Sequence, residues 1–207
     1  MSSWKSVLEQ LASLDPAEFD AANLSDEELR QFIPLAQLGI NRLTAAQTFA
    51  VAAGEAREAH AADGMVSMKT WLTGHCRLGN REAAGLVQAG RRLRVLPTLA
   101  DAYAAGAVTP AHVGVVTGAV TPARIAKAAE QGIDLDRTDQ ILTGAARALG
   151  PEDTAQAVRR WVAGIDPDGV LDDAAGLPRV FRLSRSAGGR TYLSGHLDAV
   201  GAETVHT

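Results

Sequence analysis

The sequence has 207 residues, of which 46% are apolar and 4% aromatic, and its formal net charge is −4. A chain of this length can bury a sizeable core, and a core made mainly of Ala, Leu and Val favours closely packed helices over a large sheet. No apolar run of about 18 residues and no basic-then-apolar leader is present, so we predict neither a membrane span nor a secretory signal and expect a cytoplasmic location. The single Cys76 excludes an internal disulfide and a thiolate metal cluster.

The charge is unevenly distributed along the chain. Residues 1–62 hold nine acidic and four basic side chains, residues 63–127 three and eight, and residues 128–207 twelve and eight. The basic middle third is compatible with an anionic partner. The alternative is that its cations pair with the acidic flanks.

The N-terminal part predicts two helices. Residues 1–20 carry apolar side chains at helical spacing and fit an amphipathic helix that ends near residue 15. Ser25 and Glu28 match a capping box, so a second helix is expected to begin there. It keeps helical spacing to about residue 60, with Pro34 as a point at which it kinks or breaks.

The stretch 64–119 is the part of the sequence with the clearest signals for where helices begin and end. Ser67 and Asn80 are each expected to cap a helix, because a side-chain oxygen at that position accepts an otherwise unpaired backbone N–H. The helix after Asn80 carries one apolar stripe and is expected to end at Pro97. A short helix closed by glycine and another capped by Thr109 follow it. We therefore predict compact helices joined by tight turns.

Further helices are expected after Thr121, over 134–149 and from Pro151 onward. Together with the preceding ones they predict a mainly α fold, in which residues 1–163 form a multi-helix bundle. Residues 164–178 are rich in Asp, Gly and Pro and indicate an acidic loop.

Residues 179–207 predict a small C-terminal β-hairpin followed by the start of a helix, because alternating side chains flank a turn that contains two glycines. A hairpin needs further strands or a covering helix to be stable. The last helix looks unfinished, and we expect the chain to be truncated.

Residues at predicted helix boundaries and in the predicted core follow one another in a characteristic order along the chain. They are Gly64, Trp71, Leu72, Asn80 to Ala84, Arg91 to Leu93, Leu96, Pro97, Ala102 to Gly106, Thr109 to His112, Leu183, Gly189, Leu193, Gly195, Leu197 and Asp198. This order resembles the 13E12 repeat family of high-GC Gram-positive bacteria, whose defining region is domain of unknown function 222 (DUF222). The resemblance covers about residues 28–207.

The helical region of that family is commonly followed by an HNH endonuclease module, in which histidines activate water and hold a divalent cation. The five histidines of this chain show no such pattern, and it has no C-x-x-C pair. The resemblance therefore implies a non-catalytic N-terminal domain, with longer relatives that act as endonucleases. We expect no enzymatic activity, no catalytic residue and no cofactor in this chain.

Three groups of metal-binding residue types are better explained without a metal. Adjacent side chains such as His75 and Cys76 rarely share an ion. Two other groups lie near the C-terminus, and the acidic one lacks the bidentate Glu of a calcium loop. These groups are His196, Asp198, Glu203 and His206, and Asp166, Asp168, Asp172 and Asp173. We predict no metal site.

The cations of the central stretch form the candidate site of this sequence. They are Lys69, Arg77, Arg81, Arg91, Arg92 and Arg94. Two short helices with a tight turn, the second of them basic, resemble a helix-turn-helix, whose exposed arginines contact phosphates and base edges. At about 100° per residue, Arg92 lies about 20° from Arg81 but Arg94 about 140° from it, so these arginines do not share one face. The alternative is that they pair with Asp or Glu of the acidic flanks.

Two functions follow from these observations and remain open. The first is a domain that assists DNA binding or targeting by an HNH endonuclease module, a preference that rests on analogy with the family. The second is a helical protein-interaction or oligomerisation scaffold with no nucleic-acid role.

Overall fold

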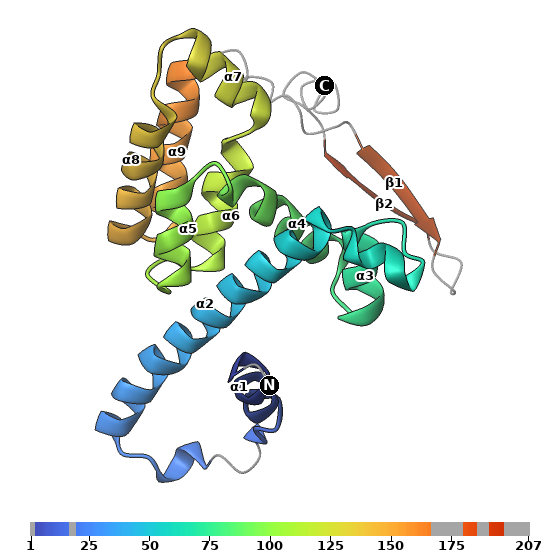
Figure 1. The fold of residues 1–207 in the computed structure, drawn as a ribbon, viewed down its shortest axis with the longest axis vertical. Coiled ribbons are helices and arrows are strands. Elements are labelled where there is room, and N and C mark those ends of the chain that lie inside the picture. Colours follow the sequence, from blue (N-terminus) through green and yellow to red (C-terminus); the bar gives the residue numbers. More distant parts are fainter. Residues whose placement is uncertain (1–2, 17–19, 167–179, 186–190, 197–207) are drawn as a thin grey trace. The chain divides into compact units, whose positions relative to one another are not determined.

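A computed structural model describes residues 3–16, 20–166, 180–185 and 191–196. The chain divides into two compact units, Met1–Ile40 and Asn41–Thr207. The helices labelled in Figure 1 are α1 (Ser3–Ala12), α2 (Asp26–Ala56), α3 (Met68–His75), α4 (Asn80–Leu93), α5 (Pro97–Ala104), α6 (Pro110–Ala119), α7 (Pro122–Glu130), α8 (Leu135–Ala148) and α9 (Pro151–Ile165), with short 3-10 turns at η2 (Ala21–Asn23) and η3 (Ala59–Asp63). The prediction of a mainly α fold is confirmed.

Two strands follow the helices within the described ranges. β1 (Val180–Arg185) pairs antiparallel with β2 (Thr191–His196), with Leu183 opposite Leu193. The turn that the sequence predicts between them and the helix that it predicts after them lie outside the described residues. The small C-terminal β-hairpin with its following helix therefore stays a prediction.

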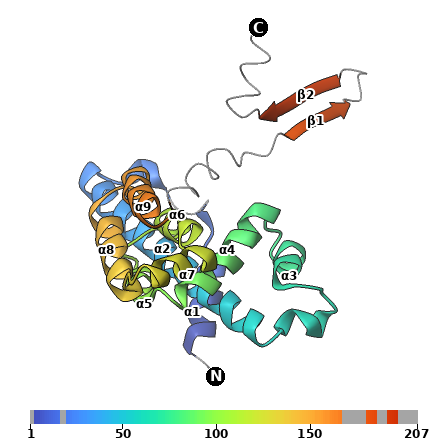
Figure 2. The same ribbon diagram turned by 90° about the horizontal axis from the view of Figure 1, so that it is seen from above.

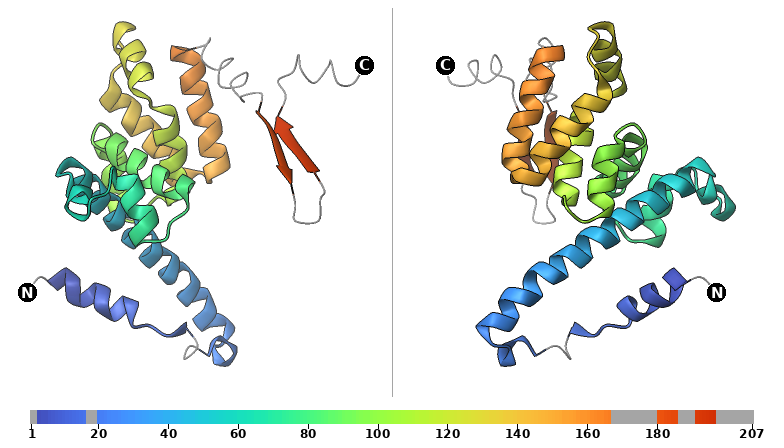
Figure 3. Two further views of the ribbon diagram at one scale, coloured as in Figure 1. Left: turned by 90° about the vertical axis from the view of Figure 1, so that its right-hand side faces the viewer. Right: turned by 60° about the vertical axis from the view of Figure 1, so that its left-hand side comes forward.

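The first unit consists of α1 and the first half of α2 (Figure 3). The capping box predicted at the start of α2 is confirmed: the backbone N–H of Glu28 donates to Ser25 Oγ at 3.3 Å, and that of Ser25 donates to the Glu28 carboxylate at 2.8 Å. Pro34 lies inside α2 and does not end it. α1 ends at Ala12, before the predicted end near residue 15.

The second unit has a large core and a smaller one. The large core lies between α4, α5, α6, α8 and α9, where α6 packs on α9 and α5 on α8 (Figure 2). Its fully buried side chains include Leu96, Leu99, Tyr103, Val116 and Leu142. The smaller core joins α3, α4 and the end of α2.

Some helix ends in the second unit are capped by side chains from other helices. Asp139 of α8 accepts the backbone N–H groups of Thr98 and Leu99 at the start of α5. His112 of α6 forms the predicted N-terminal cap with Thr109, and its Nε2 lies 3.0 Å from the carbonyl of Leu149 after α8. Since buried backbone groups need partners, these contacts replace the water that would satisfy exposed helix ends.

Other expected boundaries also differ in the structure. Helix α2 ends at Ala56, before the predicted end near residue 60. Helix α4 ends at Leu93, and Pro97, its predicted end, is the first residue of α5. Asn80 is the first residue of α4 and does not cap it, because Gly79 is the extended N-cap residue and its carbonyl accepts the N–H of Ala83 at 2.9 Å. Helix α9 runs through Gly164 to Ile165, the first two residues of the predicted acidic loop. Residues 167–178 of that loop lie outside the described residues.

Candidate functional site

The six predicted cations lie on α3, on α4 and in the turns that follow each of them. Ser67 caps α3 as predicted, because its hydroxyl accepts the N–H of Thr70 at 3.1 Å. Met68 and Leu72 bury one side of α3 against Ala83 and Val87 of α4. This small apolar cluster holds the two helices of the predicted helix-turn-helix-like layout together.

Three of the cations are exposed and have no hydrogen-bond or ion-pair partner within the part of the chain that the structure describes. They are Lys69 on α3, Arg77 in the turn and Arg81 in the first turn of α4. Arg77 has φ +55°, in the left-handed region that side chains other than Gly, Asn and Asp rarely adopt. The N-cap residue Gly79 offers no side-chain acceptor to the first N–H groups of α4.

Arg91 forms an ion pair with Glu55 of α2. Its Nη2 and Nε donate to the two carboxylate oxygens at 2.6 and 2.9 Å. These hydrogen bonds are the main reason why the pKa of Glu55 lies below its ordinary value, and they raise the pKa of Arg91. Glu55 belongs to the acidic N-terminal flank, so here the pairing with a flank that the sequence allows is observed.

Arg92 is half-buried and points to the end of α6. One nitrogen, Nη1, donates to the carbonyls of Thr117 and Val120 at 2.9 and 2.6 Å. Burial lowers the pKa of Arg92, yet a guanidinium stays protonated at neutral pH. The charge therefore serves the carbonyl end of a helix, where the macrodipole favours a cation.

Arg94 follows α4 and contacts α2. Its Nη2 donates to the carbonyl of Ala52 at 2.9 Å. Arg91 and Arg94 thus both reach the C-terminal part of α2, whereas Arg92 reaches the end of α6. Lys69, Arg77 and Arg81 remain exposed on the α3–α4 segment, whereas the other three cations contact neighbouring helices. Which of the six contact a ligand stays a prediction.

An aromatic and acidic cluster beside α3 was missed by the sequence reasoning. Trp71 and His75 stack with ring centroids 4.6 Å apart, and Asp63 accepts the Trp71 indole N–H at 2.6 Å. The same Asp63 carboxylate lies 3.6 Å from His75 Nε2. The four-residue spacing of Trp71 and His75 could have indicated the stack, whereas Asp63 comes from η3. The stack with Trp71 and the nearby Asp63 carboxylate thus hold His75 in place.

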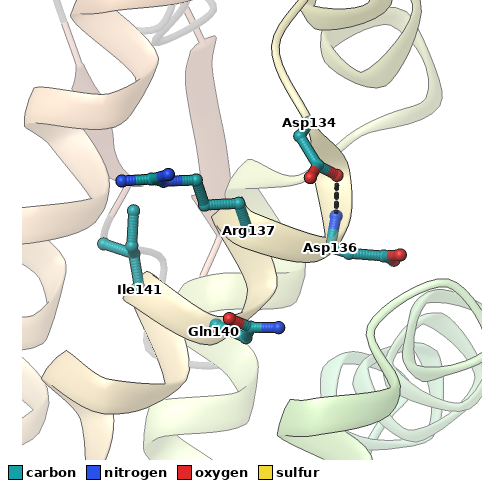
Figure 4. A pocket seen from close by; sticks show the side chains of 5 residues that line it. All are labelled: Asp134, Asp136, Arg137, Gln140 and Ile141. Carbon is teal, nitrogen blue, oxygen red and sulfur yellow. Dashed lines mark hydrogen bonds between the residues drawn. The ribbon is translucent and has the colours of Figure 1, made fainter.

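A hollow in the surface lies at the start of α8 and carries little chemistry. Asp134, Asp136, Arg137, Gln140 and Ile141 line it. Figure 4 shows that Arg137 and Ile141 extend from one side of the helix and Asp136 and Gln140 from the other, so their polar groups do not converge. Asp134 is used to cap α8, since it accepts the Asp136 N–H at 2.9 Å.

Asp166, which the sequence places in an acidic group, has cationic partners. The Arg124 Nε lies 3.3 Å from its carboxylate and Lys127 also pairs with it, which ties α7 to the end of α9. Within the described ranges no group of three or more His, Cys, Asp or Glu side chains could hold a metal ion. His75 and Cys76 are both exposed.

None of the helices in the described ranges is both long and apolar enough to cross a membrane. The sequence pattern of the family described as Domain of unknown function (DUF222) matches residues 35–207. No curated protein and no solved structure matches the chain. Because the family match extends over most of its length, from the first half of α2 to the last residue, the chain belongs to the DUF222 family.

Proposed function

We propose that this chain is a non-catalytic cytoplasmic domain that contacts DNA and helps to target an HNH endonuclease module. The observation that carries the proposal is the exposure of Lys69, Arg77 and Arg81 on the α3–α4 segment, without intramolecular partners among the described residues. Exposed cations on two joined short helices are suited to phosphate contacts. The association with an HNH module comes from the family resemblance.

The contacts of the other three arginines reduce the number of cations that can be assigned to the proposed DNA interface. Arg91, Arg92 and Arg94 each donate hydrogen bonds to another helix. Their removal would disturb packing as well as charge, so loss of binding in such variants could not be assigned to a lost DNA contact. The proposal therefore assigns the phosphate contacts to Lys69, Arg77 and Arg81.

The test is fluorescence anisotropy of a labelled DNA duplex titrated with the whole chain at about 50 and about 200 mM salt. The test variant combines Lys69→Gln, Arg77→Asn and Arg81→Gln, with Asn chosen because it tolerates a positive φ. The control combines Arg147→Gln, Arg159→Gln and Arg160→Gln, which removes three charges from exposed positions on α8 and α9.

Wild-type affinity should fall as salt rises, because DNA binding releases counterions. The test variant should bind more weakly, and the slope of log affinity against log salt should become shallower by about 3. The control should keep most of the affinity and slope. Absence of binding at low salt, or equal loss in both variants, would contradict the proposal.

A second candidate function is favoured by a different observation. Apolar side chains of α1 and the first half of α2 are exposed, and no described residue of the first unit is buried. Exposed apolar surface of this kind marks an interaction site. The first unit would then make the chain a protein-interaction or oligomerisation scaffold, which requires no DNA contact.

A further inference from the structure

The first unit presents more apolar surface than a two-helix segment can cover by itself. The exposed fraction is 63% for Trp4, 70% for Leu14, 63% for Ile33 and 68% for Leu35. Val7, Leu8 and Leu11 are also exposed. Segments of about 40 residues usually need disulfides, metals or oligomerisation to become stable, and this one contains no cysteine.

The exposed side chains of α1 form one stripe. At about 100° per residue, Trp4, Val7, Leu8 and Leu11 fall within about 100° of the helix circumference. The opposite side carries Ser6 and Gln10. A stripe of this width is the part of an amphipathic helix that packs against a neighbouring element.

The first half of α2 is apolar on two sides. Ile33 and Leu35 lie about 160° apart around the helix axis, and both are exposed. Among the described residues of its unit, α1 is the one other α-helix, and a single helix can cover only one of these sides. The second side requires a helix from elsewhere, and a helix that is apolar on two sides is typical of a bundle interior.

We propose that the first unit pairs with the first unit of a second copy of this chain, so that α1 and the first half of α2 from each copy form a four-helix bundle. The seven exposed side chains named above present on the order of 700 Å² of apolar surface per chain, against roughly 800 Å² per partner in an interface of standard size. A twofold pairing lets each copy supply the helix that the other lacks. This inference rests on the second candidate function and names its partner.

Electrostatics sets the salt dependence of this pairing. Residues 1–40 contain seven acidic and two basic side chains, so two copies of the unit repel each other. Salt screens that repulsion and strengthens apolar association, so dimerisation becomes tighter as salt rises. DNA binding would change in the opposite direction, which separates the two activities of one chain.

The experiment is sedimentation equilibrium of the whole chain from about 1 to about 100 μM, a range that resolves micromolar dissociation constants. The test variant is Leu8→Asp with Leu11→Asp, and the matched control is Ser6→Asp with Gln10→Asp, which adds the same charge to the other side of α1. All four side chains are exposed in the single chain, so neither variant should unfold it. Circular dichroism checks that the helical signal is kept.

We expect a dimer whose dissociation constant rises at least about 100-fold in the test variant and changes little in the control. A monomer at every concentration overturns the inference and leaves the DNA proposal standing. A dimer that survives both variants supports a scaffold that associates through another surface, and overturns the pairing proposed here. An equal loss of dimer affinity in both variants also overturns the proposed pairing, because the added charge alone would then explain the result.

Discussion

The carboxylate of Asp139 on α8 accepts the backbone N–H of Thr98 at 2.6 Å, at the start of α5. A second hydrogen bond, from the N–H of Leu99, reaches the other carboxylate oxygen at 3.1 Å, and Asp139 itself is buried. Leu96, the N-cap residue of α5, has no side-chain oxygen to offer. An acidic side chain from another helix therefore performs the capping that the local sequence cannot.

Asp139→Ala should lower the free energy of unfolding by about 2 kcal/mol or more, because one buried and one part-buried N–H group lose their acceptor. Asp136→Ala, at an exposed position in the first turn of the same helix, should cost about 0.5 kcal/mol or less. Urea denaturation measures both. Equal effects of the two substitutions would argue against Asp139 as the cap of α5.

Gly90 of α4 marks a close approach to α2. A Cβ at this position would lie 2.9 Å from the Ala52 Cβ and 3.2 Å from the Thr48 carbonyl oxygen, whereas a Cβ at Gly85 of the same helix would meet nothing within 4 Å. Gly90→Ala should therefore destabilise the protein by about 1–3 kcal/mol. Gly85→Ala should stabilise it by up to about 1 kcal/mol, because alanine is the better helix former. Thermal unfolding of the two variants, Gly90→Ala and Gly85→Ala, tests the close approach of α4 and α2.

Arg92→Met should lower the free energy of unfolding by about 1–3 kcal/mol, because the buried carbonyls of Thr117 and Val120 lose their donor while the alkyl stem is kept. Arg81→Met, at an exposed position in the first turn of α4, should be close to neutral. Guanidinium denaturation compares them. Equal stability of the two variants would show that the Arg92 contacts contribute little.

The ion pair of Glu55 and Arg91 should make stability depend on pH in the acid range. The hydrogen bonds from Arg91 lower the pKa of Glu55 in the folded chain. This pair's contribution is therefore fully present above the ordinary glutamate pKa of about 4.3, and is lost as the pH falls through the lower folded value. At pH 7 we expect Glu55→Gln to cost about 0.5–1 kcal/mol, and the stabilities of the wild type and the variant should converge as the pH falls below the ordinary glutamate pKa.

Urea titrations of both proteins between pH 7 and pH 3 measure this convergence. Arg91 is largely exposed, so high salt should reduce the difference at pH 7. If the difference in free energy of unfolding between the wild type and Glu55→Gln widened on acidification, the acid effect could not be assigned to Glu55.

Local signals in the sequence predicted the helix starts well. Ser25, Ser67, Thr109, Thr121 and Asp134 each precede a helix and accept one of its first N–H groups. A cap is encoded within four residues, so one sequence is enough to find it. Asn80 was the exception, because Gly79 before it can adopt the same extended conformation and the helix starts one residue earlier.

The contacts of the basic residues could be predicted only in part. Angular spacing separated Arg94 from Arg92, and these two side chains contact α2 and the end of α6. It could not show which helix each of them contacts. Such a contact depends on how α4 and α6 cross, which no local pattern encodes. The Asp63–Trp71 hydrogen bond joins residues eight positions apart across a turn and escaped the sequence for the same reason.

Capping between helices also determines how much of the second unit can open at once. The start of α5 depends on α8 through Asp139, the end of α8 faces His112 of α6, and the end of α6 depends on Arg92 of α4. When one helix detaches, polar backbone groups of the next helix lose their hydrogen-bond partners. Local unfolding of these helices therefore becomes a collective event. Amide hydrogens of α4, α5, α6 and α8 should consequently exchange with solvent deuterium at similar rates, as one cooperative block.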